Sequence, residues 1–160
     1  MLKQLISSED CKICKDKCCT FENKYKDYAP VFAEEEMLKI LKRGFSKGLF
    51  KEIKKGVWQI KLAKLGDGFW VCPFSKKNNC EIYDVRPNDC AIWPFVLVEE
   101  DKKIFLALDK GECYITEKKL NSKELKDYAN YLKEHIISDL DLGRYPKWKK
   151  GNLIIVDKIR

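Results

Sequence analysis

The feature that most constrains this chain is its set of eight cysteines, which fall into two groups. The first group is compact and close to the N-terminus, and the second is spread over the middle of the chain. The eight residues are Cys11, Cys14, Cys18, Cys19, Cys72, Cys80, Cys90 and Cys113. In a reducing compartment, clustered thiols are metal ligands more often than disulfide partners. The pattern predicts a metal-binding fold in which all eight cysteines are candidate ligands.

The N-terminus and the longest apolar runs predict such a reducing compartment. The start of the chain has a short apolar patch interrupted by Gln4 and lacks the apolar core and cleavage site of a secretory signal. Apolar runs such as 93–98 and 153–156 are far shorter than the ~20 residues that cross a bilayer. The sequence therefore predicts a cytoplasmic protein with no membrane as partner.

Spacing within the first group predicts how its thiols are used. Two residues separate Cys11 from Cys14, a gap that lets a tight turn direct both thiolates at one centre. Neighbouring side chains such as those of Cys18 and Cys19 diverge in a helix or a strand. The two cysteines are therefore expected to have different roles. In the favoured alternative they bind two separate centres, which have four cysteines each. In the other alternative one cysteine is a ligand and the other packs or is available for chemistry.

Placement of the second group depends on two expected chain reversals. Cys90 and Cys113 lie almost equally far from the middle of a hairpin predicted over 94–108, so their sulfurs are expected to meet at its open end. Cys72 and Cys80 flank a polar segment that can loop back and bring their sulfurs close. Four more thiols are thereby available to a metal.

The choice of metal rests on spacing as well. Four thiolates suit zinc and iron–sulfur clusters alike. Structural zinc usually has two clean two-residue knuckles, whereas this chain has one such pair, one vicinal pair and widely spaced single cysteines. It also has a Cys72-Pro73 step of the kind found in ferredoxin-type sites. The predicted cofactor is an iron–sulfur cluster of the [4Fe–4S] type, in one or two copies, with zinc as the alternative.

Two helices are predicted from amphipathic patterning. Acidic residues at 34–36, followed by apolar and then basic residues, predict a helix over 33–43. A longer helix is expected to begin at Asn121 or Ser122, with Glu124 in a capping box. Its apolar stripe comprises Leu125, Tyr128, Ala129, Leu132 and Ile136. This helix is expected to dock on a sheet.

Strands are predicted from period-two alternation and from short apolar runs. Alternation over 58–62 predicts a strand that pairs with 69–71 across a glycine-rich turn. Runs at 94–98 and 104–108 predict a hairpin with a charged five-residue loop, and 153–156 predict a final strand.

Together these elements predict a small single α+β domain over 1–160, with a short antiparallel sheet or hairpin, two main helices and a cysteine-rich N-terminal metal-binding loop. Residues 1–30 form the cysteine loop, whose order depends on the ligand. Residues 31–120 carry a helix, strands and the second cysteine group, and 121–160 carry the long helix and the last strand.

The residues around the cysteines form two recognisable blocks. The first is the run 11–19, and the second combines Cys72-Pro73-Phe74, Cys80-Glu81-Ile82-Tyr83, Arg86-Pro87 and Cys90 followed by Trp93-Pro94. Both blocks resemble the zinc- or iron-chelating CxxCxxCC family, whose hallmark is an N-terminal C-x-x-C-x-x-C-C motif. Here three residues separate Cys14 from Cys18, and Ala91 stands where an arginine often follows the cysteine. The wider gap also occurs in flagellin lysine N-methylases, so the resemblance implies a metal centre and a link to lysine methylation.

Other chemistry finds little support in the sequence. The formal charge of +7 comes mostly from lysines that stand beside acids, which is typical of solvated helix faces and argues against nucleic acid as a partner. No G-x-G-x-x-G motif marks a familiar S-adenosylmethionine site. The sole histidine, His135, is expected on the flank of the long helix, and Arg86 is expected to pair with Asp84 or Asp89, with donation to cluster sulfurs as another role. No catalytic residue is assigned, and enzymatic activity is left open.

The predicted function is that of an iron–sulfur protein with an electron-transfer, sensing or accessory role. A zinc-stabilised interaction module and a component of a protein lysine methylation system are the alternatives. A protein partner is compatible with each of these roles.

Overall fold

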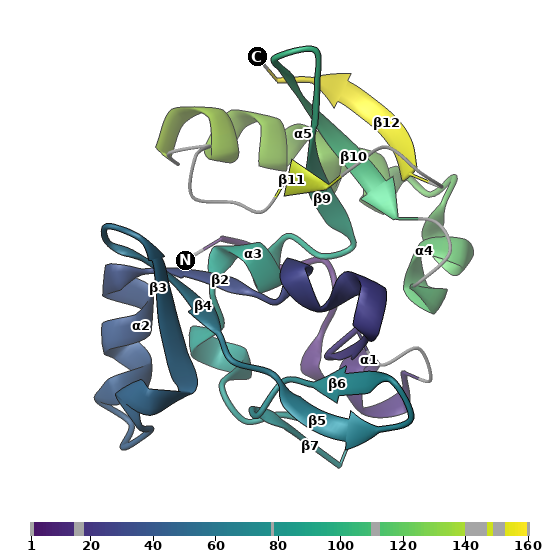
Figure 1. Cartoon of the computed structure of the whole chain (residues 1–160). Helices are drawn as coiled ribbons and strands as arrows, with labels where there is room; N and C mark the ends of the chain where they lie inside the picture. The colour runs from purple at the N-terminus through teal and green to yellow at the C-terminus, as the bar shows by residue number, and fades with distance from the viewer. Residues whose placement is uncertain are drawn as a thin grey trace.

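Short strands and helices surround two main apolar clusters, which lie in the upper and lower parts of the molecule in Figure 1. The computed structural model describes residues 2–14, 18–77, 79–109, 113–139, 147–148 and 153–159. Over these ranges the chain has five α-helices and several short, mostly antiparallel sheets. The predicted α+β class is therefore confirmed.

The upper sheet is built on the predicted hairpin. Strands β9 (Phe95–Glu100) and β10 (Lys103–Asp109) pair antiparallel, and β12 (Leu153–Lys158) confirms the predicted final strand by pairing with the other edge of β10. The short strand β11 (Lys147–Trp148) runs parallel to β9. The charged loop is shorter than predicted, because Asp101 and Lys102 alone reverse the chain.

Both turn residues have left-handed backbone angles, with φ of 50° at Asp101 and 61° at Lys102. This turn suits an Asn-Gly pair better than bulkier residues. Lys102→Gly is therefore expected to raise the free energy of unfolding by about 1 kcal/mol in denaturant titrations. Lys103→Gly, one residue further into β10, is the control and should lower it, since glycine weakens a strand. Equal effects of the two changes would contradict this assignment.

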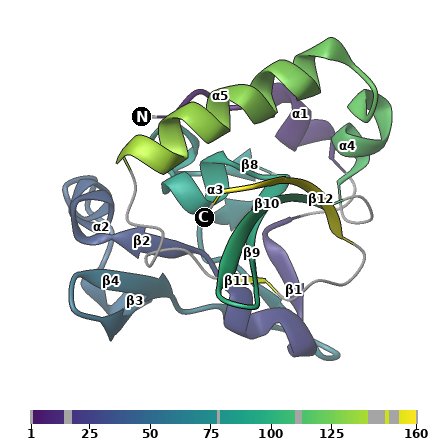
Figure 2. The ribbon, with the colours of Figure 1, turned by 90° about the horizontal axis from the view of Figure 1, so that it is seen from above.

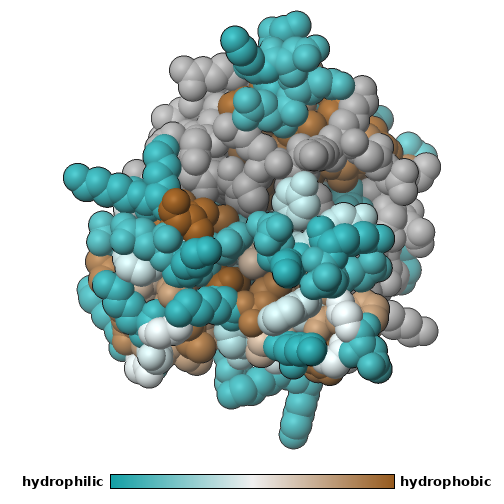
Figure 3. All heavy atoms as spheres, viewed as in Figure 1, coloured by the Kyte–Doolittle hydropathy of each residue, from teal (hydrophilic) through white to brown (hydrophobic). Residues whose placement is uncertain are grey.

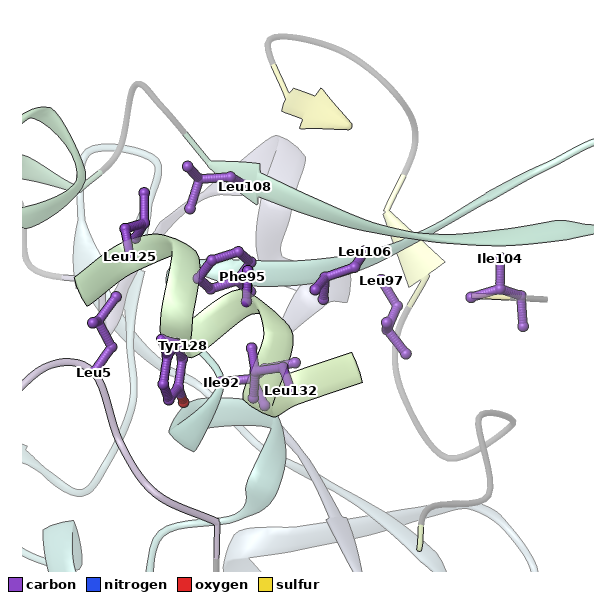
Figure 4. Packing of buried hydrophobic residues seen from close by; sticks show 11 residues of the cluster. Leu5, Ile92, Phe95, Leu97, Ile104, Leu106, Leu108, Leu125, Tyr128 and Leu132 are labelled. Atoms are coloured by element: carbon purple, nitrogen blue, oxygen red, sulfur yellow. The ribbon is translucent and has the colours of Figure 1, made fainter. Parts of the chain in front are cut away.

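The long helix α5 (Lys123–Asp139) covers one face of the upper sheet. Leu125, Tyr128 and Leu132 point toward Phe95 and Leu106 in the buried cluster of Figure 4. The Ser122 hydroxyl caps the helix by accepting the Leu125 N–H at 3.2 Å. The side chain of Ile136, the last member of the predicted stripe, lies outside the described residues.

The predicted capping role of Glu124 is wrong. Its carboxylate instead accepts a charged hydrogen bond from Lys119 Nζ at 2.8 Å. The helix starts one residue later than a Glu124 box requires, because Ser122 is the cap and Leu125, not Glu124, occupies the third helical position.

The lower region carries a second sheet with strand order β2-β4-β3. Its strands are β2 (Val31–Ala33), β4 (Val57–Ile60) and β3 (Phe50–Lys54). Helix α2 (Glu34–Leu41) confirms the predicted amphipathic helix and packs its apolar face on this sheet. Between α2 and β3 lies the 3₁₀ turn η2 (Lys47–Leu49).

The predicted pairing of 69–71 with 58–62 is wrong. Strand β6 (Phe69–Val71) pairs with β5 (Ala63–Gly66) and with β1 (Thr20–Glu22), while β4 lies in the other sheet. The tight turn 66–68, with φ of 104°, 44° and 81°, allows only the directly preceding residues to pair with β6. The chain leaves β4 after Ile60, and Lys61 and Leu62 connect it to β5, so only the residues 58–60 of the alternating run lie in a strand.

Several short elements were not predicted. The N-terminal segment, expected to be a loop, contains α1 (Ser8–Ile13), where Ser7 and Asp10 form a capping box. Others are η1 (Asn23–Tyr28), the hairpin of β7 (Ser75–Lys76) and β8 (Asn79–Cys80), η3 (Tyr83–Val85), α3 (Asn88–Ala91) and α4 (Tyr114–Lys119). These helices have only one or two turns, which is too short for a periodic apolar pattern to emerge. Figure 2 shows α4 leading into α5, which runs along one side of the molecule.

The surface has the hydrophilic character expected of a chain rich in lysine. The face drawn in Figure 3 is largely hydrophilic, with hydrophobic patches between the charged side chains. Within the described ranges, no helix combines the length and apolar character that a membrane span requires. The cytoplasmic location stays a prediction.

Candidate metal centre

The two cysteine groups are joined by the pairing of β1 with β6. Thr20 lies opposite Val71 in this pair, so the residue before β1 and the residue after β6 are neighbours. The Cys72 N–H donates to the Cys19 carbonyl at 2.8 Å. An antiparallel ladder thus brings the vicinal pair of the first group beside the first cysteine of the second group, although more than fifty residues separate them in the sequence.

Cys80 returns to Cys72 through the hairpin of β7 and β8, as the polar segment between them predicted. Ser75 lies opposite Cys80, and the Ser75 N–H donates to the Cys72 carbonyl at 2.9 Å. Cys19, Cys72 and Cys80 all contact one apolar cluster, which shields this side of the site from water. Helix α1, which carries Cys11, contacts β8 from the other side.

Cys90 and Cys113 reach the site from different elements. Cys90 lies in α3, and Cys113 precedes α4 and packs with Ile6 and Cys11. The charges that act on the Cys90 thiol are those of Asp89, Cys72, Arg86 and Cys80, whereas Cys18 acts on Cys113. A shared centre for Cys90 and Cys113 stays a prediction, but both belong to the region where the other cysteines gather.

Helix α3 is held in place by two carboxylates. Glu36 of α2 accepts the Asn88 N–H at 2.9 Å and the Ala33 N–H at 2.9 Å. Asp89 accepts the Val31 N–H at 3.0 Å, which ties α3 to β2. A helix of one turn has little stability of its own, so these contacts fix the position of Cys90.

The vicinal cysteines do not diverge as predicted. Cys18 and Cys19 lie in a turn, and their thiols form a hydrogen bond with each other. The premise of the prediction was a helical or extended backbone at both residues, and a turn removes it. The two sulfurs can therefore approach the same centre, and the number of centres, one or two, stays a prediction.

Metal-free thiols in this region are held in the protonated form. Burial, and then the neighbouring Cys80 and Cys18, raise the pKa of Cys72 to about 12. The hydrogen bond from Cys19, together with burial, raises the pKa of Cys18 well above its ordinary value. Burial also raises the pKa of Cys90, Cys11 and Cys80. Several thiolates therefore coexist here only when a cation neutralises them.

Arg86 supplies positive charge to this region. Burial and neighbouring thiols raise the pKa of the cysteines, whereas the positive charge of Arg86 lowers it. The guanidinium has this effect on four of them: Cys11, Cys18, Cys80 and Cys90. Its Cζ lies 4.5 Å from the centre of the Tyr83 ring. The Nε and Nη2 atoms of Arg86 are buried and have no hydrogen-bond partner in the described part of the chain.

The predicted pairing of Arg86 with Asp84 or Asp89 is wrong. Asp84 accepts a bidentate pair of hydrogen bonds from Arg43, one of them 2.7 Å long, and Asp89 accepts the backbone N–H of Val31. Both carboxylates therefore face other elements. Sequence proximity suggested these partners, but η3 and α3 turn the three side chains in different directions.

Tyr83 is a functional residue that the sequence reasoning missed. Its ring faces the Arg86 guanidinium, and its hydroxyl donates to the Ile6 carbonyl at 2.6 Å. Tyr83 thereby connects the arginine to the segment that enters α1 and carries Cys11. Its place in the second motif block, three residues after Cys80, was the available signal.

The residues present fit a metal–thiolate centre. Soft sulfur donors favour zinc, copper(I) and iron–sulfur clusters. A buried cation with unpartnered N–H groups favours a negatively charged group beside it. Over the described residues, no three Cys, His, Asp or Glu side chains already stand in the arrangement of a ligand shell. Thiol ligands must lose their protons to bind a metal, which couples metal binding to the pKa of these cysteines.

Comparisons with known proteins agree with the cysteine pattern. The sequence model of the CxxCxxCC family, described as a putative zinc- or iron-chelating domain, matches residues 10–128. No curated protein and no solved structure gave a match. The matched range includes all eight cysteines and Arg86 and covers most of the chain. The chain therefore belongs to the CxxCxxCC family of zinc- or iron-chelating domains.

Proposed function

We propose that this protein holds an iron–sulfur centre bound by its clustered cysteines and that it acts in electron transfer, sensing or as an accessory protein. The observation that carries the proposal is the pairing of β1 with β6, which brings the two cysteine groups together, with the charge of Arg86 acting on cysteines of both groups. A zinc–thiolate shell and an iron–sulfur cluster both carry net negative charge, which a cation nearby stabilises. An iron–sulfur cluster also exposes bridging sulfides, which accept hydrogen bonds from such a cation.

The number of centres is tested by the amount of iron. Eight cysteines are enough for two [4Fe–4S] clusters, and the hydrogen bond between Cys18 and Cys19 is equally compatible with one cluster and several supporting thiols. A tyrosine and an arginine beside the sulfurs give the chain means to adjust the reduction potential, which suits electron transfer or sensing.

The first experiment is anaerobic purification followed by an optical spectrum and iron, sulfide and zinc analysis. A brown sample with equal amounts of iron and sulfide, and a visible band bleached by dithionite, is expected. About four or about eight iron atoms per chain would distinguish one [4Fe–4S] cluster from two. A colourless sample with stoichiometric zinc would contradict the proposal and make the protein a zinc-stabilised module.

Cysteine variants test which thiols bind the metal. Cys72→Ser is expected to lose most of the bound metal, because Cys72 is buried and lies beside both Cys80 and Cys19. Ser75→Ala, in the hairpin between Cys72 and Cys80, is the matched control and should keep its metal. The same analysis on each of the other seven cysteines separates ligands from packing residues. Full metal content in Cys72→Ser would remove Cys72 from the site.

The link to lysine methylation rests on the resemblance alone. Saturable binding of S-adenosylmethionine, measured by calorimetry, is the observation that would support it. Metal-loaded protein without such binding would leave the iron–sulfur role as the proposed function. The protein partner implied by an accessory role would then be sought with the metal-loaded chain.

A further inference from the structure

Arg86 is a half-buried charged side chain, and two of its three guanidinium nitrogens are buried without a partner in the described part of the chain. In the residues that the structure describes, its Nε–H and Nη2–H are shielded from water and reach no acceptor. A buried donor without a partner costs folding free energy, and a buried cation without one costs more. Such a group persists where an anion that belongs to the working protein accepts its hydrogen bonds.

The surroundings of Arg86 identify that anion. The cysteines influenced by its charge are Cys11, Cys18, Cys80 and Cys90, which come from both motif groups. The nearby carboxylates of Asp84 and Asp89 are bound to other groups. The sulfur atoms of these four cysteines are therefore the candidate acceptors for this guanidinium.

The position of the guanidinium is fixed by packing. Tyr83 stacks beneath it, with Arg86 Cζ 4.5 Å from the ring centre, and Tyr83 is itself anchored to the Ile6 carbonyl. The next residue, Pro87, is buried and begins the turn into α3, so the backbone that follows Arg86 is fixed as well. A planar fork held in this way loses little conformational entropy when it binds sulfur.

We infer that Arg86 is the internal counter-charge of the cysteine centre and that its Nε–H and Nη2–H donate hydrogen bonds to the sulfur atoms of the bound metal–thiolate group. The inference rests on the proposed function and deepens it by assigning a positioning residue. A metal–thiolate group carries net negative charge, so Arg86 stabilises it when bound. When one electron enters an iron–sulfur cluster the negative charge grows, and the stabilisation by Arg86 grows with it.

Metal release to a chelator tests the counter-charge in the purified, metal-loaded protein. Arg86→Met removes the charge and the donors while keeping an unbranched apolar stem. It is expected to lower the affinity for the metal about tenfold, the effect of losing one charge-assisted hydrogen bond. Arg43→Met is the matched control, since Arg43 is an exposed arginine paired with Asp84, and it should release metal as the unchanged protein does.

The reduction potential tests the hydrogen bonds when the centre contains iron. Arg86→Met is expected to shift the equilibrium between oxidised and reduced cluster about tenfold toward the oxidised form, which is 59 mV for one electron. Arg86→Lys keeps the charge but not the planar fork and should give an intermediate shift. If Arg86→Met fails to fold, judged by circular dichroism, Arg86→Lys against Arg43→Lys decides the question.

The outcomes separate this inference from the proposed function. An iron–sulfur protein in which neither metal release nor potential differs between Arg86→Met and Arg43→Met would overturn the role of Arg86 and leave the proposed function standing. A zinc protein would overturn the proposed function, and the chelator experiment would still decide the role of Arg86. Tenfold faster zinc release from Arg86→Met would support the counter-charge, and equal release would refute it.

Discussion

Removal of the metal is expected to unfold the cysteine region of this protein while the sheet covered by α5 keeps its structure. The elements that carry the thiols are short: α1 has six residues, α3 has four, and β7 and β8 have two each. Such elements are not stable without tertiary contacts. Metal binding by thiolates contributes on the order of 10 kcal/mol, which is comparable with the whole stability of a domain of this size.

Hydrogen exchange with and without a chelator measures this effect segment by segment. The amides of β1, β6 and β8 are expected to lose protection, whereas those of β9 and β10 should retain it. Addition of the metal to the stripped protein is the control and should restore protection. Equal protection of both regions in the stripped protein would mean that the cysteine region folds on its own and that the metal is not structural.

Phe74→Ala is expected to destabilise the protein by about 3–5 kcal/mol and to weaken metal binding with it. Phe74 is 1% exposed and packs edge-on against Phe45, with ring centres 5.0 Å apart. It also contacts Phe32 and Phe50 in the lower cluster, to which Cys72 and Cys80 belong. A cavity at this position therefore opens directly beside two candidate ligands.

Phe69→Ala is the control for this substitution. Phe69 lies in the neighbouring strand β6 and is 43% exposed, so its removal creates no internal cavity. Denaturant unfolding of both variants in the metal-loaded state should give a loss several times larger for Phe74→Ala. Equal losses would show that Phe74 does not form the centre of the lower cluster.

The sequence predicted the elements whose signals are local. The hairpin of β9 and β10, the helices α2 and α5 and the loop between Cys72 and Cys80 each depend on patterns within a few residues. Strand pairing is not local in this sense. The pattern of 69–71 fits any adjacent strand, and only the tight turn at 66–68 selects β5 instead of β4.

Within the site, the sequence indicated the cysteines but not their arrangement. The meeting of Cys19 with Cys72 depends on the register of β1 against β6, which no local pattern encodes. Arg86 was assigned to Asp84 or Asp89 because these residues are close to it in the sequence. The partner of Asp84 is instead Arg43, which follows the end of α2. The vicinal pair was misjudged because its backbone forms a turn.

Tyr128 gives the long helix a role beyond covering a sheet. Its hydroxyl lies 2.8 Å from the carbonyl of Lys3 and 3.1 Å from the carbonyl of Ala91, so one side chain connects α5 to the chain before α1 and to α3. Cys11 lies in α1 and Cys90 in α3, so Tyr128 connects α5 with both of the helices that carry candidate ligands. A substitution at Tyr128 therefore acts on the support of the cysteine centre as well as on the packing of α5.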